Sequence, residues 1–263
     1  MKVFAVGASR NIGYYSSLSL LKAGHTVVFQ LRNTSCFDND TEIQPFVASG
    51  HAKLVRGDAM VEEEVRTAWT EANADDVAVD LVLFTVGGPP IFKLTKGWVI
   101  DPLNLCSASI LNVLSVLPRD PAQQQPRVIG VTSIGVTKDS HETLPFLFKG
   151  IYAMLAVPHA DKLGMERVIH WSAGWEWKDK EPPPTLLPEG WKERLGGSEG
   201  WLKSAVIVRP AMLTDGVEKA KYKVGENLPG LYSISRKDTA HFIVNDVLQN
   251  WEKWDGKAVA IGY

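Results

Sequence analysis

The first 33 residues, MKVFAVGASRNIGYYSSLSLLKAGHTVVFQLRN, decide the fold that this sequence predicts. A short apolar run over residues 3–6 leads into a turn that carries Gly7 and Gly13. An amphipathic stretch follows and stops at Gly24, and a second apolar run comes directly after it. Strand, glycine turn, helix and strand make a βαβ unit, and backbone N–H groups at the start of such a helix can bind a phosphate.

The glycine turn is the predicted pyrophosphate site. Gly7 permits a tight turn out of the strand, and Gly13 lets the helix pack closely on the sheet. The usual fingerprint has a third glycine, and here its place holds Arg10 or Asn11, depending on how the spacing is laid. Two glycines alone are also typical of an ordinary turn. Their position between a strand and a helix favours the phosphate site.

The end of the second predicted strand, residues 26–30, bears on which dinucleotide is bound. Sites for NAD place Asp or Glu here to hold the ribose hydroxyls, whereas a basic residue accommodates the 2′-phosphate of NADP. This chain has Arg32 and no carboxylate before Asp38, and Arg10 can approach the same phosphate from the glycine turn. The sequence therefore predicts NADP(H) as cofactor, with a solvated strand-end role for Arg32 as the alternative.

Further βα units continue the sheet. We expect strands over 53–56, 80–86, 128–132, 205–208 and 258–261, helices over 12–23, 61–72 and 235–251, helical regions around 103–117 and 152–169, and an irregular loop over 217–235. This alternation predicts an α/β protein with a Rossmann-like, doubly wound parallel sheet. Residues 1–263 are expected to form one NAD(P)-binding domain.

A segment over residues 171–203 breaks this alternation and is expected to be an insertion within the domain. Residues 170–204 hold five of the nine tryptophans, and the triple proline 182–184 excludes a continuous helix there. So many aromatic rings must be buried against something. Packing on the domain is the simplest interpretation, and a flap over the substrate or a contact with a second subunit are the alternatives.

The composition narrows the possible partners. The formal net charge is −2, so no basic field recruits nucleic acid or an anionic membrane. No apolar run approaches the roughly 18 residues of a membrane span, and the first apolar run is too short for a signal peptide. Two cysteines make no disulfide framework. We expect a cytoplasmic protein, monomeric or weakly homodimeric, that acts on a small molecule and holds no metal.

Polar and small residues follow several predicted strands, where parallel strands meet a ligand. Asp58 follows the third strand, where it could contact the adenine, cap the next helix, or do both. The small residues that follow the fourth strand, beginning with Gly87, let the backbone approach a ribose or nicotinamide closely. Ser133 follows the fifth strand, where substrate meets nicotinamide in this architecture. The alternative is that the Ser133 hydroxyl makes only a structural hydrogen bond at the end of its strand.

Taken in order, these pieces resemble the atypical short-chain dehydrogenase/reductases, in the NAD(P)-binding group near NmrA-like proteins and biliverdin/flavin reductases. The resemblance spans nearly the whole chain outside the tryptophan-rich segment. Its Arg-Pro…Leu-Thr-Asp-Gly and Ile-Ser-Arg-x-Asp pieces are the most specific. The matching pieces are residues 7–13, 21–25, 32, 57–58, 131–133, 161–162, 208–210, 213–216, 234–236 and 238–240.

The resemblance implies a Rossmann-like fold that binds NADP(H), with the segment 210–213 beside the nicotinamide. Together with their neighbours in the same turns, the candidate cofactor residues are Gly7, Ser9, Arg10, Asn11, Ile12, Gly13, Arg32, Asn33, Asp58, Ala59, Thr85, Val86, Gly87, Lys162, Pro210, Ala211, Met212 and Leu213.

The catalytic residues depart from the pattern of this family. Standard members use a serine with Tyr-x-x-x-Lys, in which the tyrosine is the general acid and the lysine lowers its pKa and holds the ribose. If Lys162 is that lysine, Pro158 stands in the tyrosine's place, and Tyr152 lies too far along the helix to pair with it. We expect Ser133 to hold a substrate oxygen and Lys162 the ribose. The proton would come from solvent, His159 or Tyr152; packing is the alternative for Tyr152, and a solvated helix position for Lys162.

Together these features favour an NADP(H)-dependent oxidoreductase, a reductase that transfers hydride to a small or medium organic carbonyl, enone or flavin-like acceptor. The missing tyrosine motivates an alternative, a non-catalytic redox sensor of the NmrA-like type that binds NADP(H). An isomerase or lyase with a bound nucleotide is a further alternative. The reductase is favoured because no basic or coiled-coil interaction element accompanies the domain.

Overall fold

The computed structural model describes residues 1–75, 77–88, 91–93, 97–120, 122–145 and 155–263. At its centre lies an eight-stranded sheet in which every neighbouring pair is parallel except the first, which is antiparallel. The predicted Rossmann-like α/β fold in a single domain is thereby confirmed. Across the sheet the strands are β10 (Lys223–Gly225), β12 (Lys257–Gly262), β8 (Ala205–Pro210), β7 (Arg127–Val131), β4 (Leu81–Phe84), β1 (Lys2–Val6), β2 (Thr26–Leu31) and β3 (Ala52–Arg56).

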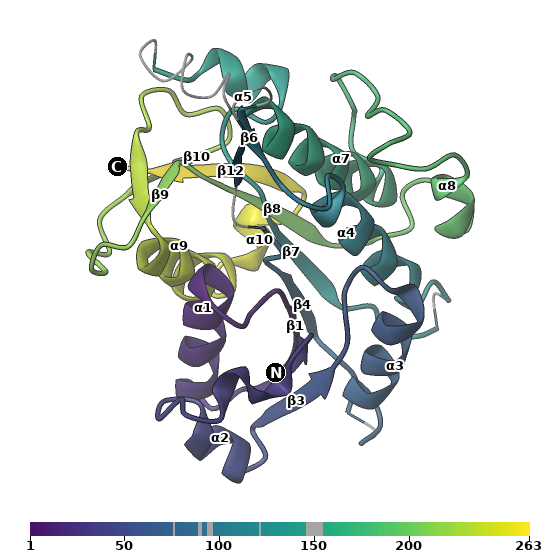
Figure 1. Cartoon of the computed structure of the whole chain (residues 1–263), viewed down its shortest axis with the longest axis vertical. Coiled ribbons are helices and arrows are strands. Elements are labelled where there is room, and N and C mark those ends of the chain that lie inside the picture. The colour runs from purple at the N-terminus through teal and green to yellow at the C-terminus, as the bar shows by residue number, and fades with distance from the viewer. Residues whose placement is uncertain (76, 89–90, 94–96, 121, 146–154) are drawn as a thin grey trace.

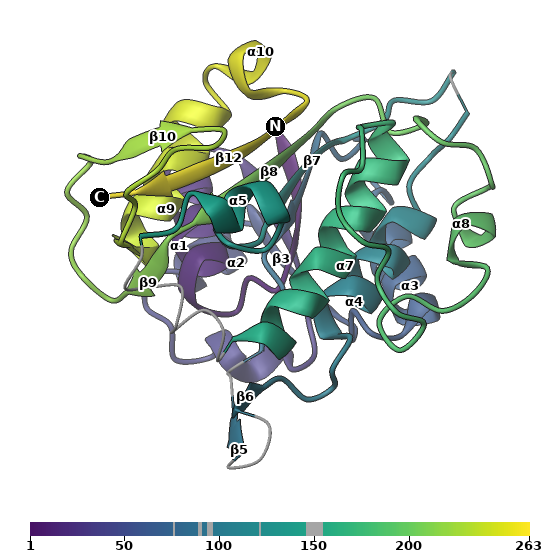
Figure 2. The same ribbon diagram turned by 90° about the horizontal axis from the view of Figure 1, so that it is seen from above.

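Helices cover both faces of this sheet, as Figures 1 and 2 show from two directions. One layer contains α1 (Asn11–Lys22) and α9 (Arg236–Phe242), and the other contains α3 (Glu62–Ala72), α4 (Leu105–Ser115) and α7 (Ala156–Ala173). The shorter elements are η1 (Thr34–Phe37), α2 (Gln44–Ala48), α5 (Lys138–Glu142), α8 (Trp191–Arg194), the π-helical turn η2 (Ile243–Val247), α10 (Trp251–Trp254), the antiparallel pair β5 (Ile91–Lys93) and β6 (Gly97–Val99), and the parallel pair β9 (Met212–Thr214) and β11 (Ser233–Ser235).

Each face of the sheet has its own apolar core. Strand β1 contributes to both, because successive side chains of a strand point to opposite faces. Val3 and Ala5 pack toward α1 and α9, whereas Phe4 and Val6 pack toward α3, α4 and α7. All of β1 is buried, which explains why this central parallel strand is a continuous apolar run in the sequence.

The two C-terminal predictions about regular structure were wrong. The expected loop over 217–235 contains β10 and β11, and the expected helix over 235–251 leaves the α-helical path at Ile243, where η2 begins. The pair β5 and β6 was not predicted either. Each of these strands has three residues, which is too short for the two-residue alternation that reveals a strand.

The tryptophan-rich segment packs on the α7 layer of the domain. Helix α7 reaches Ala173, so the first residues of the expected insertion belong to this helix. The rings of Trp171 and Trp191 meet edge to face at 5.5 Å, and the guanidinium of Arg167 lies 5.4 Å from the Trp177 ring. Among the described residues, no helix combines the length and the apolar composition that crossing a membrane requires.

Candidate functional site

The turn from β1 into α1 has the geometry of an anion-binding site. Gly7 has a φ of +81°, and a Cβ atom there would lie 2.5 Å from the backbone nitrogen of Val86. The side chain of Arg10, the N-cap residue, does not cap the start of α1, and the first turn contains no acidic residue. The first N–H groups of this 12-residue helix are therefore available to an external anion such as a pyrophosphate.

Asn11 takes the place of the missing third glycine. Its φ of 58° lies in the left-handed region, which asparagine occupies more readily than most residues with a side chain. Gly13 serves packing, because a Cβ atom there would lie 2.2 Å from Thr85 Oγ1. The Thr85 hydroxyl donates a 3.2 Å hydrogen bond to the Val6 carbonyl, so it braces the turn.

A groove of about 590 Å³ crosses the carboxyl ends of the strands beside this turn. It lies where the strand order reverses between β1 and β4, the usual ligand position in an open α/β sheet. Asn11, Ile12, Gly13 and Thr85 do not line it. Nine of the predicted cofactor residues do: Gly7, Ser9, Arg10, Arg32, Asn33, Asp58, Ala59, Val86 and Gly87.

Two arginines line the groove, Arg10 within the glycine turn and Arg32 directly after β2. Arg10 and Arg32 are both exposed, and neither guanidinium group makes a hydrogen bond or ion pair to the described residues. Asn33 beside them is already occupied, since its side-chain oxygen accepts a 3.0 Å hydrogen bond from the Ser35 amide. The two guanidinium groups are thus positively charged donors that have no partner among the described residues.

Two further groups in the groove were not predicted from the sequence. Gln30 is 4% exposed and Ser109 is fully buried, and both line the groove. Neither polar atom of the Gln30 amide, nor the Ser109 hydroxyl, has a hydrogen-bond partner among the described residues. A glutamine within an apolar central strand is the signal that could have identified this position, because a buried amide needs a partner.

Asp58 holds the turn that follows β3. Its carboxylate accepts a 2.9 Å hydrogen bond from the Met60 amide, and its carbonyl accepts one of 3.0 Å from the Val61 amide. Helix α3 begins after Val61 without a side-chain cap. The alternative in which Asp58 caps this helix was therefore wrong.

A second cavity, of about 240 Å³, adjoins the groove, and Gly88 lines both. Pro158, which stands where the family has its tyrosine, is buried in the wall. Tyr152 lies outside the described residues. The other predicted catalytic residues and the predicted nicotinamide segment meet here: Ser133, His159, Lys162, Pro210, Ala211, Met212 and Leu213.

Lys162 and His159 have shifted pKa values in this cavity. Burial lowers the pKa of Lys162, against the opposing effect of nearby Cys106 and Asp161. Burial and the charge of Lys162 lower the pKa of His159 to about 4, so the imidazole is neutral at neutral pH. The Ser133 hydroxyl makes a long, 3.5 Å contact with the Pro210 carbonyl and no other hydrogen bond to the described residues.

A buried ion pair lies behind the cavity. Arg209 donates two hydrogen bonds to Glu166, of 3.0 Å from Nε and 2.5 Å from Nη2, and the Thr132 hydroxyl donates one of 2.7 Å. Burial raises the pKa of Glu166, but the charge and hydrogen bonds of Arg209 outweigh it and hold the pKa below its ordinary value. This bidentate geometry compensates the cost of removing both charges from water.

Asp161, the neighbour of Lys162, has a structural role. Its buried carboxylate accepts hydrogen bonds from the amides of Cys106 and Ser107, at 2.7 and 2.9 Å, and from the Ser107 hydroxyl at 2.6 Å. These donors belong to the first turn of α4, so Asp161 caps that helix from α7. The cap fixes the part of α7 from which Lys162 projects.

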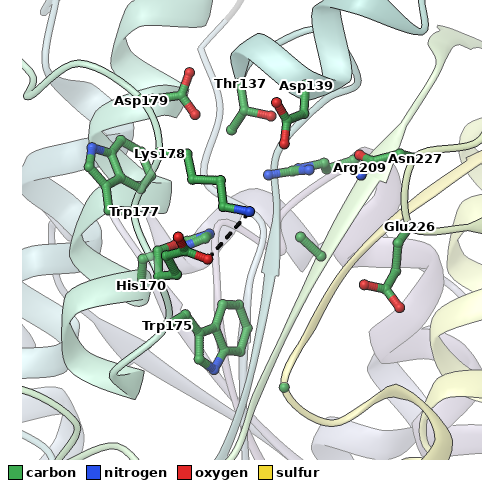
Figure 3. A pocket seen from close by; sticks show the side chains of 13 residues that line it. Thr137, Asp139, His170, Trp175, Trp177, Lys178, Asp179, Arg209, Glu226 and Asn227 are labelled. Carbon is green, nitrogen blue, oxygen red and sulfur yellow. Dashed lines mark hydrogen bonds and ion pairs between the residues drawn. The ribbon is translucent and has the colours of Figure 1, made fainter.

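A third cavity, of about 210 Å³, lies apart from this site, beside β8 and the loop that follows α7. Figure 3 shows His170, Trp175 and Trp177 on one side of it and Arg209 on the other. Lys178 also lines this cavity, and its Nζ lies 3.3 Å from Oε2 of Glu176. Of the predicted catalytic and cofactor residues that the structure describes, none lines this cavity.

The reversing strand order, the uncapped helix start and the adjoining cavity define a dinucleotide-binding domain of the Rossmann type with space for a second molecule. The chain is 30% identical over 203 residues to Reductase pytE of Aspergillus terreus, which covers 72% of this chain and 69% of that protein. No family model matches the sequence.

Solved structures share the fold. ChuY, an anaerobillin reductase from Escherichia coli O157:H7, superposes with a TM-score of 0.61 at 17% identity, over 100% of this chain and 97% of that one. A short-chain dehydrogenase/reductase from Veillonella parvula DSM 2008, in complex with NADP, does so with a TM-score of 0.58 at 14% identity, over 100% and 94%.

This chain belongs to the same family as Reductase pytE, and it has the Rossmann-type fold of solved short-chain dehydrogenase/reductases. It is an oxidoreductase of the reductase type. The predicted resemblance and enzyme class are thereby confirmed.

Proposed function

We propose that this protein is an NADP(H)-dependent reductase whose hydride acceptor is a small or medium organic carbonyl, enone or flavin-like molecule. The observation that carries the proposal is the junction of the groove with the Lys162 cavity at Gly88. A dinucleotide with its pyrophosphate at the start of α1 would extend from Arg32 on one side to Lys162 on the other. When bound, NADPH supplies a hydride from its nicotinamide ring.

The preference for NADP(H) follows from charge. The 2′-phosphate needs cationic donors, and Arg10 and Arg32 are exposed to the groove with no ion pair to the described residues. Asn33, which follows Arg32, is neutral, so no carboxylate repels the phosphate at the end of β2. A guanidinium also forms the strongest, bidentate hydrogen bonds with a phosphate.

The residues of the second cavity have separate roles in this proposal. The Ser133 hydroxyl, held only weakly by the protein, donates to the substrate oxygen. Lys162 binds the ribose and gives a proton to that oxygen as the acceptor carbon gains its hydride, so that a carbonyl leaves as an alcohol. The His159 imidazole is neutral at neutral pH, so it is not an imidazolium that could act as the general acid there. In this proposal Lys162 replaces the tyrosine missing at Pro158 as the proton source, with solvent as the alternative source.

Loss of NADPH absorbance with a panel of ketones, aldehydes, enones, quinones and flavins tests the proposal. We expect turnover with one of these classes and tighter binding of NADPH than of NADH, read from tryptophan fluorescence. Tight NADPH binding without turnover of any panel member would favour the redox sensor, because Pro158 lacks the usual acid. Equal affinities for NADPH and NADH would overturn the NADP(H) assignment.

A further inference from the structure

The third cavity, beside β8 and the loop that follows α7, carries more carboxylates than cations. Two cationic side chains line it, and both are already paired: Arg209 with Glu166, and Lys178 with Glu176. The lining carboxylates in excess are Asp139 on α5, Asp179 after α7 and Glu226 after β10. Glu226 lies 3.9 Å from Lys257 Nζ, which is long for an ion pair. This excess of negative charge favours a cationic ligand.

The carboxylates of this cavity do not converge on one point. Figure 3 shows Asp139 and Asp179 along one side of the cavity and Glu226 along another. Among the residues that the structure describes, no three His, Cys, Asp or Glu side chains are arranged to hold a metal ion. A cation that reaches both sides is therefore an extended molecule, with a positive charge at each end.

Trp175 gives the cavity an aromatic surface. Trp175 and Trp177 both line it, and His170 packs edge to face against each ring, with centroid distances of 5.2 and 5.1 Å. The guanidinium of Arg167 already lies over the Trp177 ring, whereas no cation of the described chain lies over the Trp175 ring. Tryptophan attracts a cation more strongly than other aromatic residues do, so Trp175 is an acceptor for a bound ammonium group.

The chain places an alkylammonium group of its own in this cavity. Lys178 lines the wall with its aliphatic stem, and the dashed line in Figure 3 marks its pair with Glu176. The Lys178 side chain is 62% exposed, so a free amine can displace it at little cost. The volume of about 210 Å³ lies below the roughly 300–1,000 Å³ of pockets for larger ligands, which suits a short aliphatic chain.

We propose that the third cavity binds a short aliphatic diamine, a chain with an ammonium group at each end. Asp179 accepts a hydrogen bond from the Lys138 amide through Oδ1, which leaves Oδ2 for one ammonium group. Glu226 pairs with the other ammonium group, and the chain between them crosses Trp175. The site is separate from the dinucleotide groove and from the Lys162 cavity, so this inference does not rest on the proposed function.

Calorimetry with three probes of similar length tests the charge requirement. The probes are 1,4-diaminobutane, butylamine and 1,4-butanediol. We expect the diamine to bind about threefold more tightly than the monoamine, because its second charge adds one exposed ion pair. The neutral diol should not bind. Raising the salt concentration from about 10 to about 150 mM should weaken binding of the diamine, since its partners are accessible to solvent.

Variants of the wall test the position of the site. Trp175→Leu should weaken diamine binding about fivefold, and Trp175→Phe should weaken it less because an aromatic ring remains. Glu226→Gln should weaken it about threefold. Glu189→Gln is the matched control, because Glu189 is also exposed but does not line the cavity, and it should leave the affinity unchanged.

Several results would overturn the diamine site. They are no binding of the diamine, equal binding of the diol, and diamine binding that neither Trp175→Leu nor Glu226→Gln weakens. Binding of Mg²⁺ in place of the diamine, dependent on Glu226 but not on Trp175, would indicate a site for an inorganic cation instead. Circular dichroism verifies folding, and Glu226→Gln at an exposed residue provides the test if Trp175→Leu does not fold. Failure of NADPH turnover would remove the proposed function and leave the diamine site standing.

Discussion

Lys162 Nζ donates a 2.6 Å hydrogen bond to the backbone carbonyl of Thr132. The hydroxyl of the same threonine donates to Glu166, which is paired with Arg209. One residue at the end of β7 therefore joins the candidate proton donor to the buried ion pair. The strands β7 and β8 and the helix α7 hold the ammonium in place at the cavity, which is the preorganisation that a reacting group requires.

Replacing Lys162 with methionine should remove the proton donor while keeping most of the side-chain volume. We expect kcat to fall about 100-fold, the lower range for loss of a general acid, with far-UV circular dichroism unchanged. Lys178→Met is the control, since Lys178 lines only the third cavity. A variant of Lys162 with wild-type kcat would exclude the lysine as proton donor.

The pH dependence follows from the direction of the Lys162 pKa. Burial lowers that pKa below the ordinary value of a lysine, and only the protonated form is an acid. Activity should therefore hold below the lowered pKa and decline as the pH rises through it, at a lower pH than an exposed lysine would give. The pH profile of kcat should lose this alkaline limb in Lys162→Met. Retention of the limb in the variant would assign it to another group.

Arg32→Ala should alter the choice between dinucleotides. Hydrogen bonds to charged groups contribute about 1.5–3 kcal/mol, so the Kd for NADPH should rise about tenfold or more while that for NADH stays unchanged. Arg56→Ala is the matched control, because Arg56 is exposed at the end of β3 but does not line the groove. Fluorescence titration measures both constants, and an equal loss for the two dinucleotides would contradict the role given to Arg32.

The left-handed conformation of Asn11 predicts an unusual order of substitutions. Asn11→Gly should preserve the free energy of unfolding, whereas Asn11→Val should lower it by about 1–2 kcal/mol because Cβ meets the backbone at positive φ. Urea denaturation measures both. Asn39→Val, at an exposed residue without positive φ, should change the free energy little. A neutral effect of Asn11→Val would mean that the turn relaxes out of this conformation.

Removing Glu166 alone from the buried ion pair should lower the free energy of unfolding far more than removing both partners. Glu166→Leu leaves Arg209 charged and buried, and we expect a loss of about 3–5 kcal/mol in the free energy of unfolding. Adding Arg209→Met should restore most of that loss, because the uncompensated charge is gone. Glu42→Leu is the comparison, since the ion pair of Glu42 with Lys22 is exposed on both sides. Equal effects of the two single variants would contradict this account.

The first βαβ unit was predictable because local signals agree there. The helix predicted over 12–23 is observed as Asn11–Lys22, and the strand over 26–30 as Thr26–Leu31. Apolar runs, the two glycines and Gly24 all favour the same boundaries. The three-residue strands β10 and β11 carry no such agreement, because they pair with strands about 20 or more residues away in the chain.

The candidate site likewise contains residues that the sequence predicted and residues that it did not. Ser133, Lys162 and the 210–213 segment meet in one cavity, as expected from strand ends that share an edge. The roles of Gln30, Ser109 and Asp161 depend on what surrounds each side chain after folding. No pattern along the chain distinguishes a buried amide that lacks a partner from one that has found it.

Cys36 lines the dinucleotide groove and is the exposed one of the two cysteines. Its surroundings raise the pKa of the thiol, mainly through partial burial and also through the carboxylates of Asp38 and Asp40. At neutral pH the sulfur therefore stays almost entirely in the thiol form, which reacts slowly with oxidants and electrophiles. Partial burial, reinforced by the acidic loop after Cys36, thus lets the protein keep a thiol in this groove with little exposure to oxidative damage.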